Sequence, residues 1–142
     1  MTNGVTKIVK KLFLAFLPPL ITFIVYFILF FGSFNVNIEF WSVVFHFLGG
    51  FTVSWSIWLL EKKFSSWLHF SSSFILAIFI VSVTGLVGIL WEFWEWSMDF
   101  YFGLNFLGDV NDTLFDLFMD LIGSITIVCY LFLVDKLTIL SR

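Results

Sequence analysis

Long apolar runs separated by short polar segments make up most of the 142-residue chain. Four of these runs are long enough to cross a bilayer core of about 30 Å as helices, which takes roughly 20 residues each. They lie at about residues 12–31, 41–60, 73–98 and 112–134. Strands of a membrane barrel would instead alternate polar and apolar positions over about ten residues. The pattern therefore predicts an all-α membrane protein, a bundle of four transmembrane helices.

Composition excludes a soluble protein. Hydrophobic residues make up 61% of the chain and charged residues only 12%, whereas soluble domains carry about 25% charged residues. The chain therefore lacks the polar surface that a water-facing globule needs. At this length we expect residues 1–142 to form a single integral membrane domain. The one cysteine, Cys129, excludes a disulfide within the chain.

The first apolar run has two distinguishing features. Lysines precede it, as in a signal peptide, but the run is too long and no small-residue cleavage site follows, so we interpret it as a retained span. Pro18 and Pro19 lie inside it, and proline removes a helix hydrogen bond. We expect a bend or break there, with a short interfacial or re-entrant helix before the prolines as the alternative.

The basic residues predict the orientation. They lie before the first run, between the second and third runs and after the fourth run, and these three places share one side of a four-span bundle. Because cytoplasmic segments carry an excess of Lys and Arg, both termini are predicted to be cytoplasmic, in a multi-pass protein of the cell membrane. The residues are Lys7, Lys10, Lys11, Lys62, Lys63, Lys136 and Arg142.

The acidic residues gather on the opposite, outer side. With a helical rise of about 1.5 Å per residue, His46 lies roughly 7 Å inside the outer end of its span, Glu92 about 9 Å and Asp120 about 12 Å. Three different spans thus bring ionisable side chains to one slab of the outer leaflet. The outer acids are Glu39, Glu92, Glu95, Asp99, Asp109, Asp112, Asp116 and Asp120.

Spacing predicts that these side chains point at one another. Residues three or four positions apart share a helix face, and in three spans the polar stripe also contains glycine, which marks close helix contact in membranes. A central Asp costs about 2.5–3.5 kcal/mol to insert, while an apolar residue returns only about 0.3–0.6 kcal/mol, so unpartnered charge is expensive. The stripes are His46, Gly49 and Gly50; Gly85, Gly88, Glu92 and Glu95; and Asp109, Asp112, Asp116, Asp120 and Gly123.

One imidazole among clustered carboxylates suits a divalent cation, which relieves the repulsion between them. Oxygen ligands favour Mg²⁺, Ca²⁺ or Mn²⁺, and a histidine also admits Zn²⁺ or Fe²⁺. We predict a metal site in a polar pocket between the last three spans, with Asp109 as a further member of the pocket. The predicted ligands are His46, Glu92, Asp116 and Asp120. The alternative is a network of protonated carboxylates that packs the helices.

The remaining sequence features point to no particular reaction. No Ser-His-Asp arrangement, phosphate-binding glycine loop or di-iron Glu-x-x-His motif is recognisable in the sequence. Trp41, Trp91, Trp94 and Trp96 lie at the predicted outer boundary, where amphipathic rings commonly form an aromatic belt. We interpret these four tryptophans as such a belt rather than as groups that stack on a substrate.

Three motifs resemble the VanZ-like membrane proteins and a related family of uncharacterised bacterial and archaeal inner-membrane proteins. The motifs are HFLGG (46–50), Glu92-x-x-Glu95 and DVNDTLFDLFMDLIGS (109–124). In that group a histidine early in one span, acids ending the next and an Asp-x-x-x-(Asp or Asn)-x-x-Gly run opening the last recur in order. Many VanZ-like proteins have Glu-x-x-x-Gln, so the spacing here is closer to the uncharacterised relatives. The resemblance supports the site residues and implies no particular reaction.

The leading hypothesis is a metal-binding, enzyme-like protein that acts on a lipid or lipid-linked cell-envelope substrate near the outer leaflet. Glu95 or Asp112 would then serve in general acid–base catalysis, a role that suits a carboxylate among like charges. One alternative is a proton- or cation-coupled transporter or flippase, which needs a polar path continuing inward. Another is a non-catalytic assembly protein. Membrane lipids are the expected partners, nucleic acid is not, and a homo-oligomer stays open.

Overall fold

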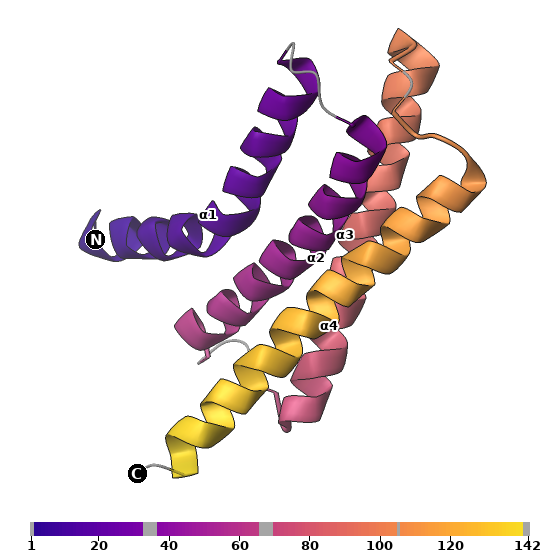
Figure 1. Ribbon diagram of the computed structural model, residues 1–142. Helices are drawn as coiled ribbons and strands as arrows, with labels where there is room; N and C mark the ends of the chain where they lie inside the picture. The colour runs from indigo at the N-terminus through magenta and orange to yellow at the C-terminus, as the bar shows by residue number, and fades with distance from the viewer. Residues whose placement is uncertain (1, 33–36, 66–69, 105, 141–142) are drawn as a thin grey trace.

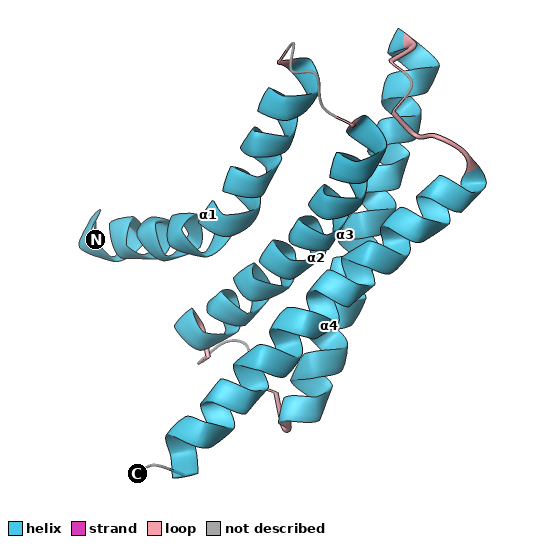
Figure 2. Cartoon of the chain, viewed as in Figure 1, coloured by secondary structure: helices cyan, strands magenta, loops and turns pink. Residues whose placement is uncertain are grey.

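The computed structural model describes residues 2–32, 37–65, 70–104 and 106–140, except for the side chains of residues 2, 3, 38 and 136–140. Within these ranges the chain forms four helices and no strand (Figures 1 and 2). Each helix is long and apolar enough to cross a membrane, so the all-α architecture with four candidate spans is confirmed. The helices are α1 (Thr2–Phe31), α2 (Ile38–Lys63), α3 (Ser73–Phe102) and α4 (Val110–Leu140).

Polar and glycine residues set where the helices begin and end. Asn37 caps α2 and Ser72 caps α3, each side chain accepting a hydrogen bond from a backbone N–H of the first turn. Helix α3 ends at Gly103, whose φ of +64° is left-handed and favours glycine. The Asp99 carboxylate then accepts two backbone N–H bonds from the following loop. These contacts fix the direction in which the chain enters α4.

Helix α1 bends at Pro18 and Pro19, as the sequence predicts (Figure 1). Neither proline has a backbone N–H to donate, so two helix hydrogen bonds are lost at this point. The part before the prolines turns away from the bundle, and only the part after them runs alongside α2. Lys11 ties the first part to the end of α2, because its Nζ donates to the Lys63 carbonyl at 3.2 Å. The bend is confirmed, and the interfacial or re-entrant position of the first part stays a prediction.

The most extensive contact in the bundle joins α2 and α4, and glycine lets their backbones meet. A Cβ at Gly50 would overlap the Asp120 carbonyl, and one at Gly123 would overlap the Phe47 carbonyl. On α3, a Cβ at Gly88 would lie only 2.5 Å from Asp120 Oδ2. The prediction that glycine stripes mark helix contacts is confirmed at these three positions.

One helical turn after Gly50, three buried hydroxyl groups meet in what we call the hydroxyl layer. Ser54 of α2 is hydrogen-bonded at 2.7 Å both to Thr84 of α3 and to Ser124 of α4. All three side chains are almost completely buried, so their mutual hydrogen bonds take the place of water. An apolar core follows, whose buried members are Leu76, Ile80 and Val128.

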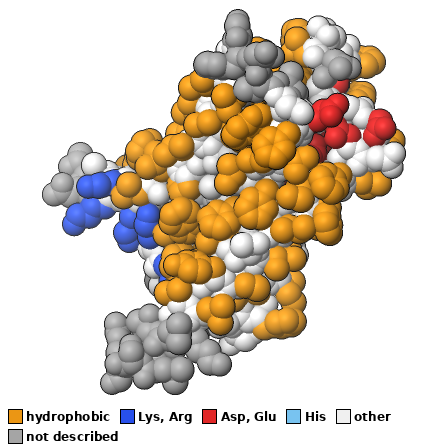
Figure 3. Space-filling view, viewed as in Figure 1, with side chains coloured by type: hydrophobic (Ala, Val, Ile, Leu, Met, Phe, Trp, Pro, Cys, Tyr) orange, Lys and Arg blue, Asp and Glu red, His pale blue; other side chains and the backbone are white. Residues whose placement is uncertain are grey.

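Charge divides the bundle into two ends (Figure 3). We call the end where α3 finishes and α4 begins the acidic end, because it carries Asp99 and Asp112. The opposite lysine end carries the lysines of α1 and of the last turn of α2. Arg142 and the Lys136 side chain lie outside the described residues. The cytoplasmic placement of both termini stays a prediction.

Candidate metal centre

Three helices each supply one ionisable side chain to a single buried point near the acidic end. His46 comes from α2, Glu92 from α3 and Asp116 from α4, and each is less than a tenth exposed. His46 Nε2 lies 3.3 Å from Asp116 Oδ2 and 3.9 Å from Glu92 Oε1. One ligand atom from each residue lies within 4.8 Å of the other two. The structure thus brings three of the four predicted ligands together.

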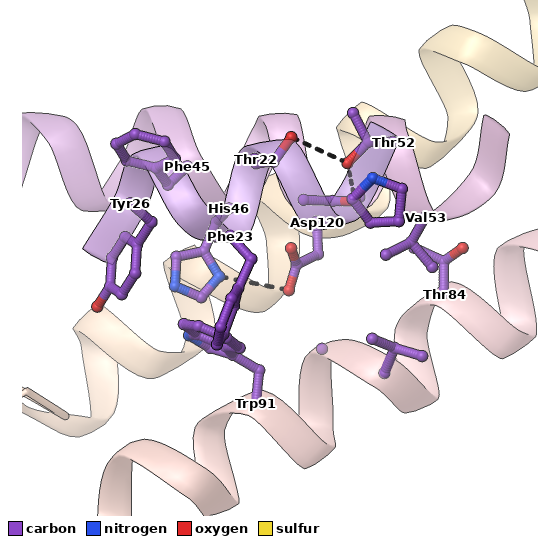
Figure 4. Close-up of a pocket in the computed structure, with 15 residues that line it drawn as sticks. Thr22, Phe23, Tyr26, Phe45, His46, Thr52, Val53, Thr84, Trp91 and Asp120 are labelled. Carbon is purple, nitrogen blue, oxygen red and sulfur yellow. Dashed lines mark hydrogen bonds and ion pairs between the residues drawn. The ribbon is translucent and has the colours of Figure 1, made fainter. Parts of the chain in front are cut away.

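The fourth predicted ligand, Asp120, lies at the other nitrogen of the imidazole (Figure 4). Its Oδ2 is 3.4 Å from His46 Nδ1, whereas Glu92 and Asp116 face Nε2. A carboxylate at one ring nitrogen fixes the tautomer and the ring orientation, and leaves the other nitrogen available to a metal. Asp120 is therefore placed to orient His46.

Several carboxylate oxygens of this group are orphaned. Both oxygens of Glu92 and Oδ1 of Asp116 are buried and have no partner with good hydrogen-bond geometry among the described residues. The Thr113 hydroxyl lies near Glu92 and makes at most a weak, poorly aligned hydrogen bond to it. Asp116 Oδ2 accepts a hydrogen bond from Ser42 at 3.3 Å. The ion pairs of the group all involve His46, and no Lys or Arg of the described chain joins them. Since each unsatisfied polar group inside a membrane costs several kcal/mol, these oxygens require protons or a cation.

The donor set fits a divalent cation. Ligand atoms of Zn²⁺ lie about 2.0–2.2 Å from the ion, so two ligands of a tetrahedral site are about 3.4 Å apart. The distance of 3.3 Å from His46 Nε2 to Asp116 Oδ2 matches this spacing. The distance of 3.9 Å to Glu92 Oε1 exceeds it, and a small shift of the Glu92 side chain would close the difference. Because one donor is an imidazole nitrogen, the set suits Zn²⁺ or Mn²⁺ better than the all-oxygen sites that Ca²⁺ prefers.

Glu95, a predicted acid–base residue, has two hydrogen-bond donors of its own. Its Oε1 accepts a bond from the Trp91 indole N–H at 2.9 Å and one from the Tyr26 hydroxyl at 3.3 Å. The side chain is buried and links α3 to α1. Glu95 is therefore held by two well-aligned donors, and its catalytic role stays a prediction.

Tyr26 and Trp91 are missing from the sequence-based site. The Trp91 N–H is directed at a buried carboxylate, a contact that the aromatic-belt interpretation does not include. The sequence carries a signal for this pair, since Trp91 and Glu95 are four residues apart and share a helix face. Tyr26 has no comparable signal, because only the tertiary structure brings α1 next to α3.

The two remaining predicted residues lie at the start of α4. Asp109 Oδ1 accepts hydrogen bonds from the backbone N–H groups of Asn111 and Asp112, at 2.8 and 3.0 Å. Asp109 is exposed and caps the helix, rather than forming a wall of the pocket. Asp112 is half-buried beside Gly108 and lies one turn before Asp116. The acid–base role of Asp112 stays a prediction.

A cavity of about 240 Å³ adjoins His46 between α1, α2 and α3 (Figure 4). Asp120 is the residue of α4 that reaches it. The rings of Phe23, Tyr26 and Trp91 surround the imidazole on this side. The cavity thus meets the site at His46 Nδ1 and Asp120, while the three grouped ligand atoms lie on the Nε2 side of the ring.

The chain belongs to a family of predicted membrane proteins, DUF2238, whose model matches residues 5–136. An uncharacterised protein of Thermotoga maritima is 32% identical over 98 residues, which cover 68% of this chain and 50% of that protein. The chain therefore spans about half the length of this relative. No solved structure matches the chain. Family membership agrees with the membrane fold and assigns no reaction.

Proposed function

We propose that this protein holds a divalent cation near its acidic end and acts there on a lipid or lipid-linked cell-envelope substrate. The cation ligands are His46 Nε2, Glu92 and Asp116, and Asp120 orients the imidazole. The observation that carries the proposal is the set of buried, orphaned oxygens of Glu92 and Asp116 beside one imidazole nitrogen. A network that only packs helices has no need of orphaned acceptors, because hydroxyl or amide side chains can satisfy one another.

The proposed chemistry needs a bound cation and one acid–base group. When bound, a divalent cation polarises a carbonyl or phosphoryl oxygen and activates water. Asp112, half-buried one turn before Asp116, is the preferred acid–base group. Glu95 is the second choice, because Trp91 and Tyr26 already donate to its Oε1. Kinship with VanZ-like proteins would be consistent with such a site and stays a prediction.

The position of the site favours a lipid over a water-soluble substrate. All three ligands lie within candidate membrane spans, and the adjoining cavity is walled mainly by apolar side chains. The predicted orientation faces the acidic end outward, since the lysines lie at the opposite end. A lipid headgroup of the outer leaflet can then reach the cation without crossing the membrane.

The layering of the bundle weighs against a transporter. A polar path towards the lysine end would have to continue beyond the hydroxyl layer. In the described chain, the apolar core of Leu76, Ile80 and Val128 follows that layer, and the buried Ser56 hydroxyl beyond it has no hydrogen-bond partner that would extend a path. This order favours a site that is reached from one end of the bundle. It argues against a continuous transport pathway through one protomer.

Elemental analysis tests the cation site. Protein purified in detergent and dialysed against Zn²⁺ or Mn²⁺ should retain close to one equivalent, and Glu92→Gln or Asp116→Asn should lose it. Both substitutions preserve side-chain shape and remove one charge. Glu39→Gln is the matched control, because Glu39 is an exposed acid in the first turn of α2. Wild-type protein that retains no metal would overturn the proposal.

Action on lipids requires a second assay. Metal-loaded protein in vesicles of total lipid from its host should generate a new lipid product, detected by mass spectrometry, that disappears with chelator and in Glu92→Gln. Bound metal with unchanged lipids would retain the cation site and favour the non-catalytic assembly role.

A further inference from the structure

We propose that the cavity beside His46 is a binding site for one hydrocarbon chain of a membrane lipid, which enters from the bilayer between α1 and α3. The inference rests on the proposed function, because it describes how a lipid substrate reaches the cation site. The cavity measures about 240 Å³, whereas sites for whole small molecules usually have about 300–1,000 Å³. The space therefore suits a segment of one chain and not an entire lipid.

The lining has the pattern of an amphiphile, apolar along its length and polar at one end. Hydroxyl groups of Thr22, Thr52 and Thr84 also line it, but each is already hydrogen-bonded within the protein. His46 and Asp120 supply the polar atoms at the end of the cavity nearest the metal centre, whose other ligands lie on the Nε2 side of the imidazole. The apolar walls come from three helices and include Pro19, Phe23, Phe45, Val53 and Val87.

The two helices that flank the cavity, α1 and α3, are joined by side chains and not by close backbone packing, and one of these contacts is the Tyr26–Glu95 hydrogen bond. Among the described residues, no Cα atom of α1 lies within 8 Å of one in α3. The helices meet through side chains, including the Phe23–Trp91 and Tyr26–Trp91 ring pairs, with centroids 5.6 and 5.3 Å apart. Since side chains change rotamer much faster than packed helices separate, an entrance between α1 and α3 opens without disturbing the α2–α4 contact.

Selectivity in such a site comes from its polar end. A hydrocarbon chain gains no hydrophobic stabilisation by leaving the bilayer, because lipid tails are as apolar as the cavity walls. A lipid is therefore retained only if its head also interacts with the cation held by His46, Glu92 and Asp116. An anionic phosphate ester has the oxygen ligands and the charge for this contact.

Photocross-linking in vesicles tests the chain site. Protein is reconstituted with phosphatidylglycerol that carries a diazirine in one acyl chain, and the labelled residues are located by mass spectrometry. We expect labelling at Phe45 and Val53, which line the cavity and are less exposed than Phe23 and Val87, and we expect unlabelled phosphatidylglycerol to compete it away. Labelling confined to outward-facing residues, or labelling that no excess of lipid reduces, would show contact with bulk lipid only and overturn the proposal.

Cavity-filling variants provide the matched comparison. Val87→Trp should reduce the competable labelling severalfold, whereas Leu86→Trp should not, because Val87 lines the cavity and its neighbour Leu86 does not. Val53→Phe fills the cavity from α2 and should act like Val87→Trp, so a folding defect in one variant does not decide the result. Equal labelling in the filled variants and in Leu86→Trp would overturn the proposal.

Metal analysis of the same samples separates this inference from the proposed function. Bound metal without competable cavity labelling overturns the chain site and leaves the cation site standing. Competable labelling without bound metal overturns the proposed function and the role of the cation in retaining the lipid, and leaves only the location of the chain site.

Discussion

Two buried polar layers lie in the contact between α2, α3 and α4, and they differ in whether their polar atoms are satisfied. Each takes one side chain from each helix. The hydroxyl layer is closed by hydrogen bonds of 2.7 Å. The other, which we call the carboxylate layer, consists of His46, Glu92 and Asp116, and three of its oxygens have no well-aligned hydrogen-bond partner among the described residues.

The difference separates a structural role from a functional one. A hydrogen bond between membrane helices contributes on average about 0.6 kcal/mol, so a satisfied layer stabilises helix packing modestly and needs nothing else. An orphaned polar group in a membrane costs several kcal/mol, which helix packing alone does not offset. Burial and helix of origin are the same in both layers. Hydrogen-bond satisfaction is what points to a ligand.

The largest expected effect is that the cation stabilises the folded protein. This stabilisation should depend on the carboxylate layer and not on the hydroxyl layer. Zn²⁺ or Mn²⁺ at 100 times its Kd should raise the free energy of unfolding by about 2.7 kcal/mol in the wild type. Asp116→Asn should lose this response, because it lacks a charged ligand, and Ser54→Ala should keep it. Thermal unfolding in detergent with and without metal measures the effect. An equal response in Asp116→Asn would contradict the assignment of the two layers.

Asp120 should affect the carboxylate layer indirectly. Removing a group that orients a metal-binding histidine typically weakens metal affinity about 10–100-fold, so Asp120→Asn should raise the Kd by this factor, or about 1.4–2.7 kcal/mol. Titration against a chromophoric chelator gives the value. An unchanged Kd would mean that the Asp120–His46 contact does not orient the ring.

The hydroxyl layer should matter for stability and not for metal binding. Ser54→Ala leaves Thr84 and Ser124 without their common partner, so we expect a loss of about 1 kcal/mol in unfolding free energy. Thr126→Ala is the control, because the exposed Thr126 hydroxyl bonds a carbonyl of its own helix at 2.7 Å. Denaturant unfolding gives the difference. A large loss of metal affinity in Ser54→Ala would show that the hydroxyl layer belongs to the metal site.

The smallest effect is expected at Tyr26. Tyr26→Phe removes one of the two donors to Glu95 while Trp91 remains, so stability should fall by no more than about 0.6 kcal/mol. Metal affinity, measured in parallel with Asp116→Asn, should not change. A loss of metal affinity as large as that of Asp116→Asn would show that Glu95 belongs to the metal site.

The sequence by itself determined the fold class and a set of candidate site residues. Lipid offers the backbone no hydrogen-bond partners, so four long apolar runs must form helices. Intervals of three and four residues then place His46, Glu92, Asp116 and Asp120 on helix faces that also carry glycine. Since charge is costly against lipid, those faces are expected to point inward, but nothing in the pattern separates Asp120 from the other three residues.

Only the tertiary structure decided which partner each polar atom has. Periodicity defines the face of a helix, but the depth and rotation of one helix against another depend on packing. Here the close contacts of Gly50 and Gly123 set the position of α4 against α2. That position brings Asp120 to His46 Nδ1 and leaves Asp116 at Nε2. The placement of α1, which brings Tyr26 to Glu95, follows from side-chain contacts far apart in the sequence, which no local pattern encodes.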